Sequence, residues 1–318
     1  MTAVPCPPGR RAQRPAWRRL FGAVLALSAL MYLGWMVVKD FNSFWTTLRS
    51  QTPGALAAAM IAAIAMFAIK AIYHALLCER LSGKTNLMDH VIPAYAIAQV
   101  VRYLPGKVWG IVYQSGRLSQ HLHPSVVVTA NTSQTLMTNL LGSGIIGSVL
   151  AAAYLESPWP LGGVVFALVF TELLHRNPRV EAWLLGAVSR LLRRPVDVQR
   201  IPPQMFRGTL MLALEWAAYY FMWSAILGSA IPTWSTIVIS TWYAAASLLA
   251  IFAVAVPAGI AVREALFVSL AAMTAGTQGE LVGYAALMRL ILTLAEIALI
   301  PVTMVADRIV RRGRGSAE

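Results

Sequence analysis

Cysteine, acidic residues and long polar stretches are all scarce in this sequence. Its two cysteines, Cys6 and Cys78, are too few for a disulfide framework or a cysteine-ligated zinc site. No polar stretch is long enough to form a separate soluble domain. Only 12% of the residues are charged, whereas 58% are hydrophobic. This composition predicts an all-α polytopic membrane protein with one membrane domain.

The few acidic residues leave a large positive excess. The chain has 26 Lys and Arg against 13 Asp and Glu, a formal net charge of +13. Sixteen of the 26 lie in three segments, residues 1–19, 175–207 and 307–318. The positive-inside rule explains this clustering better than nucleic-acid binding does. We therefore predict that all three segments are cytoplasmic, that both termini lie inside an inner or plasma membrane, and that the number of crossings is even.

The apolar runs predict about six full membrane helices within one domain, residues 20–306. The first, about Leu20–Val38, we interpret as an uncleaved helix, because no small-residue cleavage site follows it. A short outer loop with Lys39, Asp40 and Arg49 comes next. The other predicted helices cover about Gly54–Cys78, Ser125–Leu155, Pro160–Leu174, Gly208–Gly228 and Leu281–Ala306.

Two Pro/Gly breaks interrupt apolar sequence, one in each half of the chain: Pro105-Gly106, and Pro257 with Gly259. A break is tolerated in lipid only where protein or a wet cavity supplies partners for the freed backbone groups. The segments beside the breaks are Leu87–Leu104, Lys107–Gln120, Thr236–Val256 and Ala258–Ala275. We predict two re-entrant hairpins that meet at a substrate site, and an inverted repeat, because the flanking helices run in opposite directions. Eight crossings would satisfy the charge rule equally.

A polar stripe marks one face of the predicted helix 125–155. Asn131, Gln134, Thr135 and Thr138 recur at offsets of three, four and seven residues, which places them on one side of a helix. We expect this stripe to face other helices or water rather than lipid.

Charged side chains inside the apolar segments are a second candidate feature. They include Lys70, His74, Glu215, Arg263, Glu264, Arg289 and Glu296. Such charges are costly, so they either pair with one another and lock the bundle or serve a substrate. On an ideal helix Arg263 and Glu264 point about 100° apart. We therefore expect Arg263 to bind a phosphate, and Glu264 to bind backbone amides or another cation.

Two further groups of residues could hold a ligand. Arg102 and Lys107 flank the first break and could seat a phosphate, or they could extend to lipid headgroups. His121 and His123 have no acidic or cysteine partner at a spacing that would complete a metal site. We predict no metal and no cofactor.

The cytoplasmic segment 175–207 contains an amphipathic pattern. Its apolar face consists of Val180, Trp183, Leu184, Ala187, Val188, Leu191 and Leu192, and arginines occupy the other side. This pattern is typical of a helix that lies on an anionic membrane surface. Packing on a partner protein is the alternative.

The motifs at the two breaks carry a family resemblance. The first reads Tyr103-Leu-Pro-Gly-Lys-Val-Trp109 and the second Pro257-Ala-Gly-Ile-Ala-Val-Arg-Glu264. Together they resemble the flippase-like transmembrane domain of lysylphosphatidylglycerol synthases and their stand-alone relatives. In the second motif, Ala258 and Ala261 stand where that family has glycine.

The resemblance implies a lipid flippase or transporter that moves a phospholipid or a polyprenyl-phosphate-linked lipid. Its partners would be anionic or phosphate-bearing membrane lipids. The alternative is a non-transporting subunit that scaffolds an envelope glycosyltransferase or a lipid-modifying enzyme. We predict no enzymatic activity, because no Gly-rich phosphate loop and no Asp-rich motif in a large outer loop occurs. The predicted substrate-binding residues are Arg102, Pro105, Gly106, Lys107, Asn131, Gln134, Pro257, Gly259, Arg263, Glu264, Arg289 and Glu296.

Overall fold

The structure is a computed structural model that describes residues 41–101, 109–192, 207–228, 231–251, 262–272 and 278–315. Within these ranges the secondary structure is helical and contains no strand, which confirms the predicted all-α class. The elements are α2 (Phe41–Ser50), α3 (Pro53–Ser82), α4 (Met88–Val101), α5 (Trp109–Arg117), α6 (Pro124–Tyr154), the 3-10 turn η1 (Trp159–Leu161), α7 (Gly162–Arg176), α8 (Pro178–Leu192), α9 (Arg207–Leu227), α10 (Thr233–Leu249), α11 (Val262–Ala271) and α12 (Gln278–Gly315). The predicted first helix, residues 20–38, lies outside the described residues.

Four of the described helices are long and apolar enough to cross a membrane: α3, α6, α9 and the part of α12 from Glu280 to Val305. The 30 residues of α3 extend about 45 Å at 1.5 Å per residue. The hydrocarbon core of a bilayer is only about 30 Å thick. The chain is therefore a helical membrane protein.

The long helices begin and end at residues that satisfy their free backbone groups. Thr52 caps α3 by accepting a hydrogen bond from the Ala55 amide at 3.2 Å, and Pro53 occupies the first turn. Gly83 ends α3 with φ of 68°, a left-handed conformation that suits glycine. His123 caps α6 in the same way as Thr52, with its ring nitrogen accepting from the Ser125 amide at 3.3 Å.

The described part of the predicted outer loop, residues 41–49, is helical. Phe41 and Trp45 stack one turn apart on α2, with their ring centroids 6.2 Å apart, and the Arg49 guanidinium lies 4.8 Å from the Trp45 ring centre. These contacts at a spacing of four residues stabilise a helix that hydropathy alone does not reveal.

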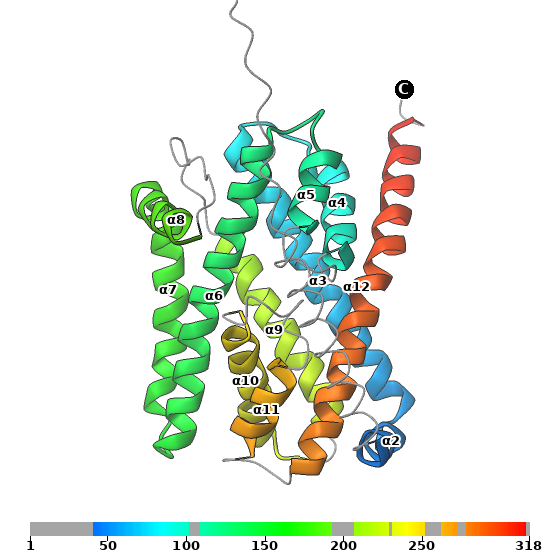
Figure 1. Cartoon of the computed structure of the whole chain (residues 1–318), viewed down its shortest axis with the longest axis vertical. Coiled ribbons are helices and arrows are strands. Elements are labelled where there is room, and N and C mark those ends of the chain that lie inside the picture. Colours follow the sequence, from blue (N-terminus) through cyan, green and yellow to red (C-terminus); the bar gives the residue numbers. More distant parts are fainter. Residues whose placement is uncertain are drawn as a thin grey trace, which may run out of the picture.

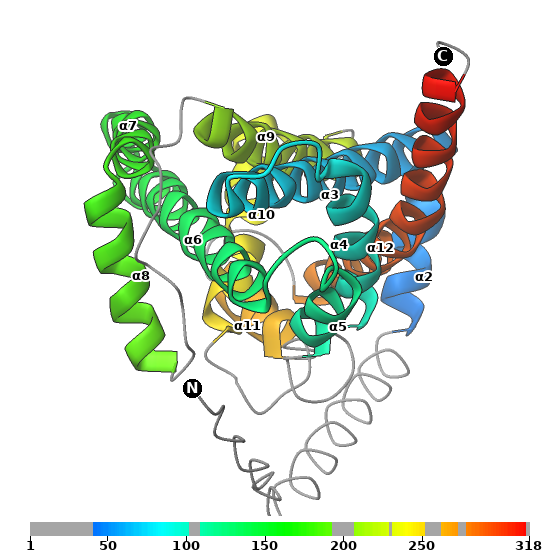
Figure 2. The same ribbon diagram turned by 90° about the horizontal axis from the view of Figure 1, so that it is seen from above.

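The short helices form two groups at opposite ends of the bundle. Figure 1 shows α4 and α5 at the end that also holds α8 and the C-terminal end of α12, whereas α10 and α11 lie toward the other end. Seen from above, α7 and α8 lie along one edge of the bundle, and α12 and α2 along the opposite edge (Figure 2). The predicted segments Leu87–Leu104 and Lys107–Gln120 contain short helices, with 14 residues in α4 and 9 in α5. The Pro/Gly breaks themselves lie outside the described residues, so the re-entrant hairpins stay a prediction.

The interior is packed around α3 and α9, which pack side by side. Trp223, Tyr243 and Phe267 form an aromatic cluster among α9, α10 and α11, with centroids 5.1–6.0 Å apart. On the other side of the bundle, Gly144 of α6 meets Ala167 of α7 so closely that an added Cβ would lie 2.4 Å from the alanine methyl. Close packing of this kind holds α7 against the bundle.

Candidate functional site

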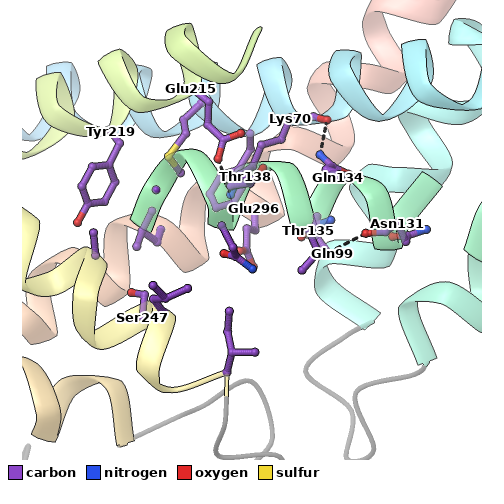
Figure 3. A pocket seen from close by; sticks show the side chains of 18 of the residues that line it. Lys70, Gln99, Asn131, Gln134, Thr135, Thr138, Glu215, Tyr219, Ser247 and Glu296 are labelled. Atoms are coloured by element: carbon purple, nitrogen blue, oxygen red, sulfur yellow. Dashed lines mark hydrogen bonds and ion pairs between the residues drawn. The ribbon is translucent and has the colours of Figure 1, made fainter. Parts of the chain in front are cut away.

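A cavity of about 710 Å³ lies in the middle of the bundle. All of the helices α3 to α6 and α9 to α12 contribute to its wall. Among the described residues, five charged side chains line it: Lys70, Glu215, Arg263, Arg289 and Glu296. Figure 3 shows Lys70, Glu215 and Glu296 close to the polar stripe of α6. The four candidate membrane spans, in α3, α6, α9 and α12, all line the cavity.

Lys70 and Glu215 form an ion pair across the interface between α3 and α9. The Lys70 Nζ lies 3.1 Å from Glu215 Oε1, and Glu215 is only 5% exposed. Figure 3 shows the two side chains pointing toward each other. Of the two roles that the sequence left open for these charges, pairing is observed for this couple. Lys70 also lies 5.9 Å from the ring centre of Phe67, and it lines the cavity.

The predicted polar stripe of α6 faces the cavity, as expected. Asn131, Gln134, Thr135 and Thr138 all line it. Gln134 donates to the backbone carbonyl of Lys70 at 2.9 Å, and its Oε1 lies 3.0 Å from the His74 ring. The amide of Gln134 therefore fixes α6 against α3 and orients the rest of the stripe.

Asn131 continues the stripe toward α5. Its Nδ2 donates to Gln114 Oε1 at 2.7 Å and to the Val127 carbonyl at 2.8 Å. Gln114 is 1% exposed and also lines the cavity. Asn131 and Gln114 therefore place amide groups in the part of the cavity wall where α4 and α5 lie.

Arg263 lies in the first turn of α11 and contacts Glu264 directly. Its Nη2 and Nε donate to Glu264 Oε1 at 2.8 and 3.1 Å. The guanidinium also lies 4.7 Å from the ring centre of Tyr243. The expected partner of Glu264 was a backbone amide or another cation, and this prediction missed the Arg263 contact. The 100° between Arg263 and Glu264 on an ideal helix separates only their Cα–Cβ bonds. The long arginine side chain can bend back to contact its neighbour.

Arg289 and Glu296 supply the charges of α12. Both line the cavity, seven residues or about two turns apart. Glu296 is 2% exposed. Counting Glu264 with its partner Arg263, the described cations at the cavity (Lys70, Arg263, Arg289) balance the carboxylates (Glu215, Glu264, Glu296). The described part of the site is therefore formally neutral when nothing is bound.

The structure brings together most of the predicted binding residues that it describes. Asn131, Gln134, Arg263, Arg289 and Glu296 line one cavity, and Glu264 adjoins it through Arg263. The remaining six, Arg102, Pro105, Gly106, Lys107, Pro257 and Gly259, lie outside the described residues.

Sequence reasoning missed the aromatic and amide part of the wall. Gln99, Gln114, Trp216, Tyr219 and Tyr243 also line the cavity. The half-polar character of the segment 87–120 was a signal for the two glutamines. Aromatic residues in an apolar helix give no such signal, because they suit lipid, core and cavity equally.

A second polar cluster lies at the α8 end of the bundle, away from the cavity lining. Arg80 of α3 donates to both carboxylate oxygens of Glu181, at 2.7 and 3.2 Å, and Ser133 of α6 donates to the same carboxylate at 2.9 Å. Glu181 is 1% exposed. The prediction that α8 simply lies on a surface is therefore incomplete: its Glu181 side is fixed to the bundle, whereas Trp183 is 65% exposed.

The described residues contain no group of three His, Cys, Asp or Glu that could hold a metal ion. His121 stacks on His90 with centroids 4.0 Å apart, and His123 caps α6. Compared with known proteins, the chain matches no protein-family model and no curated protein. The resemblance to the flippase-like family thus rests on the two sequence motifs and stays a prediction.

Proposed function

We propose that this protein is a transporter that moves a phosphate-bearing lipid between the leaflets of a membrane. The observation that carries this proposal is the 710 Å³ cavity inside a membrane-spanning bundle, with Lys70, Arg263 and Arg289 in its wall. Three cations in one intramembrane cavity are unusual, because each is costly to keep in a low dielectric. A recurrent reason to keep them is an anionic ligand.

The headgroup would bind where the two arginines reach the cavity. A guanidinium can hold a phosphate through two parallel hydrogen bonds, and Arg263 is held in place by the Tyr243 ring. The acyl chains would stay in the surrounding bilayer. Glu264 and Glu296 hold the cations in place while the site is empty, or they exchange protons during transport.

The transport cycle would use the two groups of short helices. We propose six crossings, with both termini in the cytoplasm of an inner or plasma membrane, and with α4–α5 and α10–α11 as re-entrant hairpins from opposite faces. Their positions at opposite ends of the bundle support this arrangement. The same positions support an inverted repeat, in which one hairpin opens the cavity to each side in turn.

Transport in liposomes tests the proposal. The purified protein is reconstituted with fluorescent anionic phospholipid, and transfer between leaflets is followed by chemical quenching of the outer leaflet. We expect Arg263→Lys to slow transfer, because an ammonium cannot reproduce two parallel bonds. Arg49→Lys is the matched control, since Arg49 lies on α2 away from the cavity.

Three results would count against this function. If Arg263→Lys and the wild type transfer lipid at the same rate, Arg263 does not hold the phosphate through two hydrogen bonds. A large loss of melting temperature in Arg263→Lys would assign Arg263 a structural role. No transfer of any of several anionic lipids by the wild type would favour the scaffolding alternative.

A further inference from the structure

The cavity wall carries polar atoms that the ion pairs do not use. Glu215 Oε2, Trp216 Nε1 and Thr138 Oγ1 are each buried, and none has a hydrogen-bond partner within the part of the chain that the structure describes. All three residues line the cavity. Buried polar atoms are paired in the great majority of cases, so three unpaired atoms at one cavity point to a ligand that supplies the missing partners.

Trp216 and Thr138 lie where α9 meets α6, and the Glu215 side chain reaches Lys70 of α3 beside them. Glu215 and Trp216 are neighbours on α9. The Trp216 indole lies over Gly142 of α6, where an added Cβ would come within 2.6 Å of the ring carbon Cζ2. Gly142 follows Thr138 by one helical turn on the same face. Figure 3 places Glu215 and Thr138 together, beside Lys70.

The chemistry of the three groups selects the ligand. An ionised carboxylate oxygen only accepts, an indole N–H only donates, and a threonine hydroxyl does both. An ammonium group would satisfy Glu215 but not Trp216, and a phosphate would satisfy Trp216 but not Glu215. A hydroxyl group can donate to one and accept from the other. Neighbouring hydroxyls on one ring match a set of this kind.

We propose that this α6–α9 wall is a hydroxyl-binding subsite, and that the transported headgroup carries a sugar or another polyol beside its phosphate. The proposal rests on the transport function above, because it assigns the phosphate to the Arg263 and Arg289 side of the cavity. Trp216 and Tyr219 both line the cavity, edge to face with centroids 5.5 Å apart, so the apolar face of a sugar could contact either ring.

Lipid selectivity tests the subsite. The full-length protein is placed in phosphatidylcholine nanodiscs that contain equal amounts of phosphatidylinositol and phosphatidylethanol with the same acyl chains. Both probes are phosphodiesters, and only the first carries a polyol. Native mass spectrometry then gives the ratio of the two retained lipids. We expect phosphatidylinositol to be preferred about tenfold, the effect of one or two hydrogen bonds.

Substitutions that remove one hydrogen-bonding group at a time locate the preference. Trp216→Phe and Thr138→Val should each lower the ratio about threefold, the effect of one hydrogen bond. The matched control is Thr236→Val. Its Oγ1 atom is also buried without a partner among the described residues, but Thr236 does not line the cavity. The control ratio should equal that of the wild type.

The outcomes separate this inference from the transport proposal. Equal retention of both probes, with transport intact, would overturn the hydroxyl subsite and leave the transporter standing. Retention of neither probe, with no transport, would overturn the transporter itself. A preference for added phosphatidylethanolamine would overturn the hydroxyl in favour of an amine. Soluble inositol phosphate is the last probe. If it displaces phosphatidylinositol at equal concentration, the subsite binds hydroxyl groups, but its ligand is a soluble polyol phosphate rather than a lipid.

Discussion

The contact between Arg80 and Glu181 should be a main determinant of how firmly α8 is attached to the bundle. The side chains are only 7% and 1% exposed, and two hydrogen bonds join them. Removing one partner of a buried ion pair costs about 3–5 kcal/mol, because the other charge stays buried. Glu181→Gln keeps the volume and one acceptor, so we expect the lower end, about 3 kcal/mol. For a chain of 318 residues, that corresponds to a fall of roughly 4–5 °C in melting temperature.

Thermal unfolding in detergent measures the loss of stability in Glu181→Gln, and two further variants serve as controls. Arg176→Gln removes an arginine that is 65% exposed and paired at a spacing of four residues, so its effect should be under about 0.5 kcal/mol. The double variant Arg80→Met with Glu181→Met leaves no buried charge and should recover most of the loss. Transport per folded molecule should not change, since the pair does not line the cavity. A fall of less than about 2 °C for Glu181→Gln, or no recovery in the double variant, would refute the reasoning.

Two other experiments test separate parts of the structure. Glu264→Gln should lower the free energy of unfolding by about 2 kcal/mol, because a charged hydrogen bond to Arg263 is lost. The same variant should retain anionic lipid, since Arg263 keeps its charge; loss of lipid binding would contradict that separation. For orientation, a cysteine at Ser157 should react with an impermeant maleimide in intact cells, whereas one at Ser189 should react only after permeabilisation. Labelling of Ser189 in intact cells would reverse the proposed topology.

Sequence alone predicted the long helices well, because the hydrophobic requirement of the membrane is local. The predicted helix Ser125–Leu155 differs from α6 by one residue at each end. The predicted helix Gly54–Cys78 stops four residues before α3 does. Hydropathy falls at the membrane edge, but the backbone stays helical until Gly83 adopts its left-handed conformation.

The polar partners could not be predicted, because they are distant in sequence. Arg80 and Glu181 are 101 residues apart, and Gln134 binds the carbonyl of a residue 64 positions earlier. A helical pattern shows which face a residue occupies, but not which helix lies opposite. The amphipathic pattern of α8 illustrates the limit: it identified an apolar face and gave no sign that Glu181 is buried.

In this cavity one charged residue can serve both roles that the sequence left open, structural pairing and ligand binding. Lys70 and Arg263 each contact a carboxylate, at 3.1 and 2.8 Å, and both still line the cavity. Without counter-charges, two cations in an empty intramembrane cavity would be strongly destabilising. Each carboxylate therefore makes the empty state stable, and a phosphate that enters competes with it for the same cation. Because the described site is formally neutral when empty, a bound phosphodiester leaves one excess negative charge, which uptake of one proton by a displaced carboxylate would cancel. Transport should then be accompanied by proton uptake, and a rate that does not change between pH 5 and pH 8 in the liposome assay would contradict this exchange.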